Sequence, residues 1–158
     1  MTTETNPAGI GIPKRYGARQ NYEGSQGRAA GVAGTRRQGV LEFNGDQPDF
    51  RTLDIPAGAV IVKTIAIVAE AGDLGGTDPV INVGVEGTEA TNTAITLTEA
   101  QAEERGAYVE MDPAGSLDAP LTEDVKIAVA LGGTSPTIAG GKYRVFIEYE
   151  FGGDLDGL

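Results

Sequence analysis

The stretch from Leu53 to Glu70 (LDIPAGAVIVKTIAIVAE) constrains the fold of this chain more than any other. Pro56-Ala57-Gly58 is a turn signal, because proline presets φ and glycine tolerates conformations that other residues avoid. The 11 residues from Ala59 to Ala69 contain neither Gly nor Pro, and 6 of them are Val or Ile. Their branched side chains favour a pleated surface over a helix. The sequence therefore predicts a long β-strand here.

Both faces of this predicted strand are apolar, whereas a strand with one wet face should alternate apolar and polar residues. If the strand is regular, Val60, Val62 and Val68 share one face, and Lys63 is the only charged residue on the other. Two interpretations fit this pattern. A loop or helix of the same chain covers the second face, or another subunit covers it. Under the second interpretation, Val60, Val62 and Val68 are the residues of self-association.

The rest of the body predicts short strands joined by Gly/Pro turns, with a single helical turn at Thr98–Arg105 that Thr98 and Gln101 can cap. The last strand, Lys142–Phe151, alternates a core face with a charged one, on which we expect Glu148 and Glu150 to form cross-strand ion pairs. These patterns predict an all-β fold, an antiparallel jelly-roll-like β-sandwich with an extended N-terminal arm and one short helical turn.

One short motif occurs twice. Leu74-Gly75-Gly76-Thr77-Asp78-Pro79 resembles a second stretch that starts 57 residues later, Leu131-Gly132-Gly133-Thr134-Ser135-Pro136. Gly-Gly and Thr-x-Pro are ordinary turn chemistry, so the sequence predicts two similar hairpin loops.

The composition excludes several kinds of chemistry. The 158 residues include no His and no Cys, which removes the commonest general base, the commonest metal ligand and any thiolate nucleophile. No cluster of Asp, Glu, Lys or Ser compensates, so we predict that the protein is not an enzyme and needs no cofactor or metal. There is no apolar run long enough for a membrane span and no signal-peptide hydrophobic region, so we expect assembly in the cytoplasm of the host cell and no membrane partner.

Charge divides the chain into three parts, namely an arm (residues 1–40), a β-sandwich (41–151) and an acidic tail (152–158). The net charge of −11 combines +4 over residues 1–40 with −15 over the remainder. Eight glycines and two prolines interrupt residues 1–40, so we expect no independent fold there. A basic arm favours an acidic protein partner, and nucleic acid is a poor fit at this modest charge. The residues we assign to partner binding are Lys14, Arg15, Tyr16, Arg19, Tyr22, Arg28, Arg36 and Arg37.

Four pieces in order carry a resemblance to a known family: Leu53–Ile61 (LDIPAGAVI), Gly75-Gly76-Thr77 leading into Val80–Gly84, Leu131–Thr134 (LGGT), and Tyr143–Tyr149 (YRVFIEY). The segment that they span, about two thirds of the chain, resembles small β-sandwich proteins on the virions of tailed bacteriophages and related archaeal viruses. Such proteins decorate or cement the capsid, often as trimers.

The resemblance implies a structural virion protein on the capsid surface, with the major capsid protein as partner and a homotrimer as its own assembly. It supplies no catalytic motif, and it does not predict the arm in detail. The alternative is a carbohydrate- or receptor-binding module of a viral tail or surface structure. Sugar platforms need exposed aromatic residues, and this chain has only 5 Tyr and 4 Phe, most of them at positions predicted to lie in the core.

Overall fold

The computed structural model describes residues 36–46 and 51–151, which form one compact unit. Its elements are β1 (Arg36–Asn44), β2 (Leu53–Ile55), β3 (Ala59–Val85), β4 (Thr93–Thr98), α2 (Glu99–Ala102), β5 (Tyr108–Met111), the 3₁₀ turn η2 (Gly115–Asp118) and β6 (Val125–Phe151). All strands pair antiparallel in one six-stranded sheet. The predicted all-β class with one short helical turn is confirmed.

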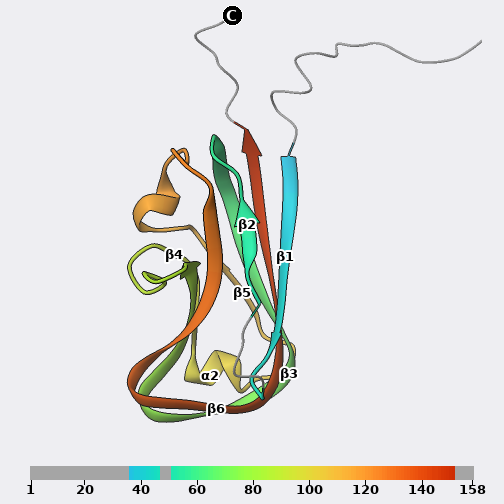
Figure 1. Ribbon diagram of the computed structural model, residues 1–158. Helices are drawn as coiled ribbons and strands as arrows, with labels where there is room; N and C mark the ends of the chain where they lie inside the picture. Colours follow the sequence, from blue (N-terminus) through green and yellow to red (C-terminus); the bar gives the residue numbers. More distant parts are fainter. Residues whose placement is uncertain (1–35, 47–50, 152–158) are drawn as a thin grey trace, which may run out of the picture. The chain divides into compact units, whose positions relative to one another are not determined.

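The sheet is organised by β3 and β6, each 27 residues long, which pair along their whole length. Figure 1 shows this two-stranded ribbon bending near α2, so that its two halves turn back toward each other. We call the layer with β1, β5, the start of β3 and the end of β6 the first half-sheet. The second half-sheet holds β2, β4, the end of β3 and the start of β6. The two facing layers therefore belong to one continuous sheet instead of the two separate sheets of a jelly roll.

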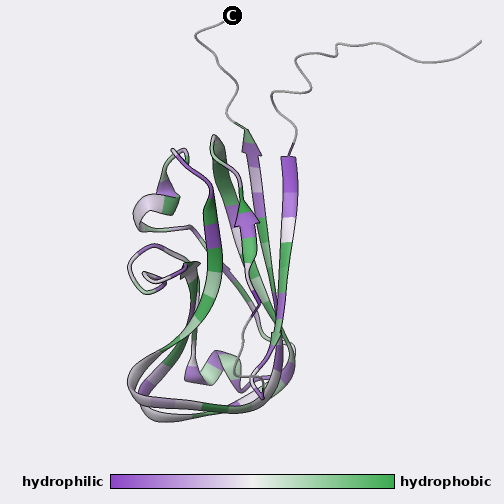
Figure 2. Ribbon diagram, viewed as in Figure 1, coloured by the Kyte–Doolittle hydropathy of each residue, from purple (hydrophilic) through white to green (hydrophobic). Residues whose placement is uncertain are grey.

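The core lies between the half-sheets. Val68, Val145 and Ile147 from the first layer and Ile81 and Ile95 from the second are all fully buried. The green segments of the ribbon in Figure 2 alternate with purple ones along the strands of the first half-sheet, as expected where one face is buried. The hydroxyl of Thr64, itself buried, donates to the carbonyl of Ala94 at 2.6 Å and so joins the layers directly.

The repeated motif does not form two hairpin loops, as the sequence predicted. Both copies are strand residues, and they pair with each other, with Thr77 opposite Thr134. Gly76 and Gly133 have φ values of +115° and +109°, which favour glycine. Asp78 and Ser135, each two residues further along its strand, have φ values of +50° and +52°. The two copies thus adopt the same irregular conformation around a local two-fold axis, close to the bend of the ribbon.

The close approach of the two strands explains why both copies carry glycine. A Cβ atom on Gly76 would lie 2.7 Å from the carbonyl oxygen of Ser135, and one on Gly133 would lie 2.6 Å from that of Asp78. Each strand occupies the space that a side chain on the other strand would need. The motif is therefore repeated because the crossing is reciprocal.

The helical turn is positioned as its sequence predicts. Thr98 caps α2 by accepting from the backbone N–H of Gln101, whose side chain accepts from the backbone N–H of Thr98. The turn is fixed to the ribbon by the hydroxyl of Tyr143, which donates to the carbonyl of Ala102 at 3.3 Å. A side-chain oxygen of Glu103 accepts from the backbone N–H of Leu74 at 3.1 Å. These contacts hold α2 beside the bend.

One predicted boundary changes, the start of the folded unit. The folded unit begins at Arg36, because Arg36 to Val40 already pair with β6, so the predicted arm of residues 1–40 overlaps β1. Residues 1–35 and the predicted acidic tail, 152–158, lie outside the described residues.

Candidate interaction surface

The outward side of the first half-sheet carries a row of apolar side chains from four strands. Val40 of β1 and Ile65 of β3 are both directly opposite Phe146 of β6, and Ile67 is opposite Tyr108 of β5. Tyr108 and Val40 are 59% and 43% exposed, and they are the exposed large hydrophobic residues of the part that the structure describes. Ile65, Ile67 and Phe146 are partly exposed. We call these five side chains the apolar row.

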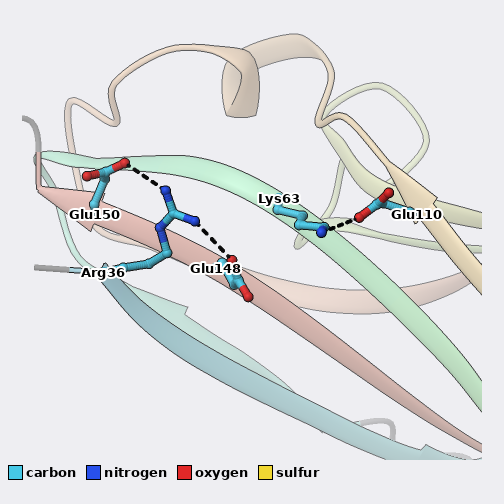
Figure 3. Close-up of polar contacts among 5 residues, drawn as sticks. All are labelled: Arg36, Lys63, Glu110, Glu148 and Glu150. Atoms are coloured by element: carbon cyan, nitrogen blue, oxygen red, sulfur yellow. Dashed lines mark ion pairs between the residues drawn. The ribbon is translucent and has the colours of Figure 1, made fainter.

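Ion pairs border the apolar row on the same side of the sheet. Arg36 lies between two carboxylates of β6, 3.5 Å from Glu148 and 3.6 Å from Glu150, and Lys63 pairs with Glu110 across β3 and β5 (Figure 3). These basic side chains are about half exposed, so each pair contributes at most about 1 kcal/mol to stability.

Next to the apolar row, Arg144 pairs with Glu42 at 2.5 Å and Lys142 with Glu70 at 3.1 Å. The predicted cross-strand ion pairing of Glu148, Glu150 and their basic neighbours is therefore confirmed, although Glu148 and Glu150 share one arginine of β1. The result is a charged border with nearly balanced charge around an apolar centre. This composition is typical of protein–protein interfaces.

Two residues assigned to the partner-binding arm make contacts within the folded unit. Arg36 makes the ion pairs described above, and the guanidinium of Arg37 lies 5.4 Å from the centre of the Phe151 ring, within the range of a cation–π contact. Their placement on a free arm is wrong, because β1 starts at Arg36. The other six, Lys14, Arg15, Tyr16, Arg19, Tyr22 and Arg28, lie outside the described residues.

The residues predicted for self-association do not form one surface. The pairing with β6 shifts between Ile61 and Lys63, so Val62 is an extra residue in β3. Beyond such a bulge the alternation of side chains is reversed. Val68 consequently points into the core and is fully buried, whereas Val60 and Val62 remain partly exposed. The prediction that Val68 is available to another subunit is wrong.

Tyr143 is a buried titratable residue at the bend of the ribbon. Burial raises the pKa of its hydroxyl above 10.0, the negative charge of Glu103 raises this pKa further, and a hydrogen bond with the backbone of Gly72 opposes the shift. The side chain is only 2% exposed. A neutral, buried hydroxyl that donates to Ala102 is a structural group of the bend and is not positioned to react with a ligand.

Sequence reasoning missed the apolar row, because its members come from four strands and meet only through their lateral register. One signal was present. Phe146 interrupts a face that otherwise carries Lys142, Arg144, Glu148 and Glu150. An aromatic residue at the centre of a charged strand face indicates a neighbouring apolar surface.

Over residues 36–46 and 51–151, no group of three or more Asp or Glu side chains is arranged to hold a metal ion. No helix in the same ranges is long and apolar enough to cross a membrane. The fold and this surface together define an all-β protein with an exposed, mixed apolar and charged sheet face. The chain matches no protein-family model, no curated protein and no solved structure.

Proposed function

We propose that the protein is a structural component of a virus particle, a decoration or cement protein that binds the major capsid protein on the outside of the shell. The observation that supports this most is the apolar row with its border of ion pairs. A large exposed apolar group on a soluble protein indicates a surface that another protein covers. The resemblance of Leu53–Phe151 to virion proteins supplies the identity of the partner.

Binding would combine two weak contacts. The apolar row offers Tyr108 and Phe146 as aromatic anchors, and the ion pairs around it select the orientation of the partner. The basic residues of positions 1–35 would add an electrostatic contact with an acidic region of the shell. When such contacts are repeated over a symmetric particle, linkage within each molecule raises the overall affinity without a strong individual contact.

The test is co-purification with virus particles. Particles from cells that make the protein are separated on a density gradient, and the protein is detected in the fractions and on the particles by immunogold labelling. We expect the protein to sediment with filled heads and to label their surface. A protein that remains at the top of the gradient while particles sediment would contradict the proposal.

Two variants distinguish the contribution of the basic segment to binding from that of the apolar row. A chain starting at residue 35 removes the basic segment and keeps β1 complete. A second variant, Tyr108→Ser with Phe146→Ser, removes the aromatic anchors. We expect each to reduce the bound fraction. The matched control is Glu86→Gln, at an exposed position just beyond β3, which should bind like the natural chain.

Tyr108 also favours the second candidate function, a carbohydrate-binding module of a tail or surface structure. It is an aromatic ring that is 59% exposed on the outward side of the first half-sheet, and sugars stack on exposed aromatic rings. A glycan array separates the two functions. Binding that is lost in Tyr108→Ala would favour the sugar-binding module over the capsid protein.

A further inference from the structure

The strand β1 lies at one side of the sheet. Its neighbour is β6, and in the part that the structure describes no strand pairs with its other side (Figure 1). It is nine residues long, pairs with β6 in one unbroken register and contains no proline. Natural proteins usually protect such edges with bulges, prolines or short strands, because an open edge pairs readily with another chain.

One hydrogen bond determines which backbone groups of β1 face the open side. The N–H of Gly45 donates to the carbonyl of Gly141 at 3.1 Å, in the register that continues β1. Because antiparallel strands alternate the direction of their backbone groups, Leu41 and Phe43 also face β6. The N–H and C=O groups of Gln38, Val40 and Glu42 then face the open edge.

A second hydrogen bond checks this assignment. If the backbone N–H and C=O groups of odd-numbered β6 residues face β1, those of even-numbered β6 residues face β3. The register between β6 and β3, together with the alternation along β3, then directs the backbone groups of Val68 away from β6. The N–H of Val68 does point away from β6, since it donates to the carbonyl of Ala107 at 3.0 Å. The assignment at β1 is therefore consistent across the half-sheet.

We propose that two copies of this chain associate through their β1 edges, antiparallel, around a two-fold axis at Val40. In this register Val40 is opposite Val40 of the second copy, and Gln38 is opposite Glu42, so amide faces carboxylate. No like charges lie directly opposite each other. An axis at Glu42 would place two carboxylates opposite each other, which is unfavourable.

The apolar row supports the same axis. Val40 is 43% exposed at the end of the row that continues through Phe146 and Ile65. The two-fold axis joins the rows of both copies into one apolar stripe across the extended sheet. The charges beside the edge do not oppose this pairing, because Arg36 and Glu42 already have partners on β6. The inference does not depend on capsid binding, because the isolated chain should associate by itself.

The first experiment measures the mass of the full chain in solution by light scattering over a range of concentrations. We expect a dimer. In Val40→Pro we expect a monomer with an unchanged circular dichroism spectrum, because proline removes an N–H that faces the open edge and none that bonds to β6. The matched control Val40→Thr keeps this N–H and should remain dimeric. A monomeric or trimeric natural chain, or a dimeric Val40→Pro, would overturn the proposal.

Cross-linking tests the position of the axis. The chain contains no cysteine, so a single introduced cysteine reports only its own neighbourhood. Residues at the two-fold would have Cα atoms about 5.5 Å apart, which suits a disulfide. We expect Val40→Cys to give a covalent dimer under mild oxidation and Tyr108→Cys, exposed on the same face, to give none. If Tyr108→Cys cross-links as rapidly as Val40→Cys, or Val40→Cys does not cross-link, the axis is elsewhere.

Discussion

The reciprocal crossing of β3 and β6 makes Gly76 the most informative position for a stability measurement. In Gly76→Ala the new methyl group would lie 2.7 Å from the carbonyl oxygen of Ser135 and 2.8 Å from that of Thr134. Both atoms belong to the backbone, so neither can move without disturbing the pairing of the two long strands. The φ value of +115° adds strain, because side chains rarely adopt it.

The magnitude follows from these two contributions. A non-glycine residue in a left-handed conformation costs about 1–2 kcal/mol. Forcing a methyl group into filled space costs about 1–3 kcal/mol more. We therefore expect Gly76→Ala to reduce the free energy of unfolding by about 2–5 kcal/mol, a large part of the roughly 5–15 kcal/mol of a typical domain. The control is Gly106→Ala, with a φ value of +89° and no atom within 4 Å of the new methyl group. It should cost only about 1–2 kcal/mol.

The assay is equilibrium unfolding in urea, with the midpoint and the slope fitted separately. We expect lower midpoints and unchanged slopes, which indicate a change in stability alone. Gly133→Ala, at the related position of the crossing, should match Gly76→Ala. The double variant should cost less than the sum, because one displacement of the strands relieves both contacts. If Gly76→Ala and Gly106→Ala lose the same free energy, the explanation of the repeated motif is wrong.

Three further predictions concern the bend and the ion pairs. Because folding raises the pKa of Tyr143, the contribution of this residue to stability is complete below pH 10 and decreases as pH rises through the folded pKa. In thermal melts, Tyr143→Phe should therefore lose less stability in alkali than the natural chain. Thr98→Ala removes the cap of α2 and should cost about 1 kcal/mol in urea unfolding, whereas Thr98→Ser should cost little; equal losses would exclude the capping explanation. Arg144→Gln breaks an exposed ion pair with Glu42 and should cost less than about 1 kcal/mol, and a larger loss would indicate a further partner of Arg144.

Local patterns were sufficient for much of the fold. The predicted last strand, Lys142–Phe151, lies within β6, and the capping box at Thr98 and Gln101 is present. Tyr143, Val145 and Ile147 occupy the core as their alternation predicted. The predictions of these features are correct because each feature depends on a few neighbouring residues. A capping box closes within one turn, and alternation needs only a strand with one buried face.

The missed features depend on residues far apart in the chain. Each copy of Gly-Gly-Thr, considered alone, is a sequence typical of turns. It forms part of a continuous strand only because the other copy lies opposite and pairs with it. Similarly, no local signal placed the bulge at Val62, which reverses the alternation and buries Val68. A bulge is defined by the partner strand, so the sequence of one strand cannot show where the alternation changes.

The sequence by itself determined the all-β class, most strand positions, the capped turn and the absence of histidine and cysteine chemistry. The tertiary structure decided which side chains share a surface. Val40, Ile65 and Phe146 are separated by up to 106 positions, and they form one row because β1, β6 and β3 pair in a particular register. Strand propensity is a property of neighbouring residues, whereas register is fixed by burying the other face of all these strands in one core. The surface proposed for binding is a consequence of that packing.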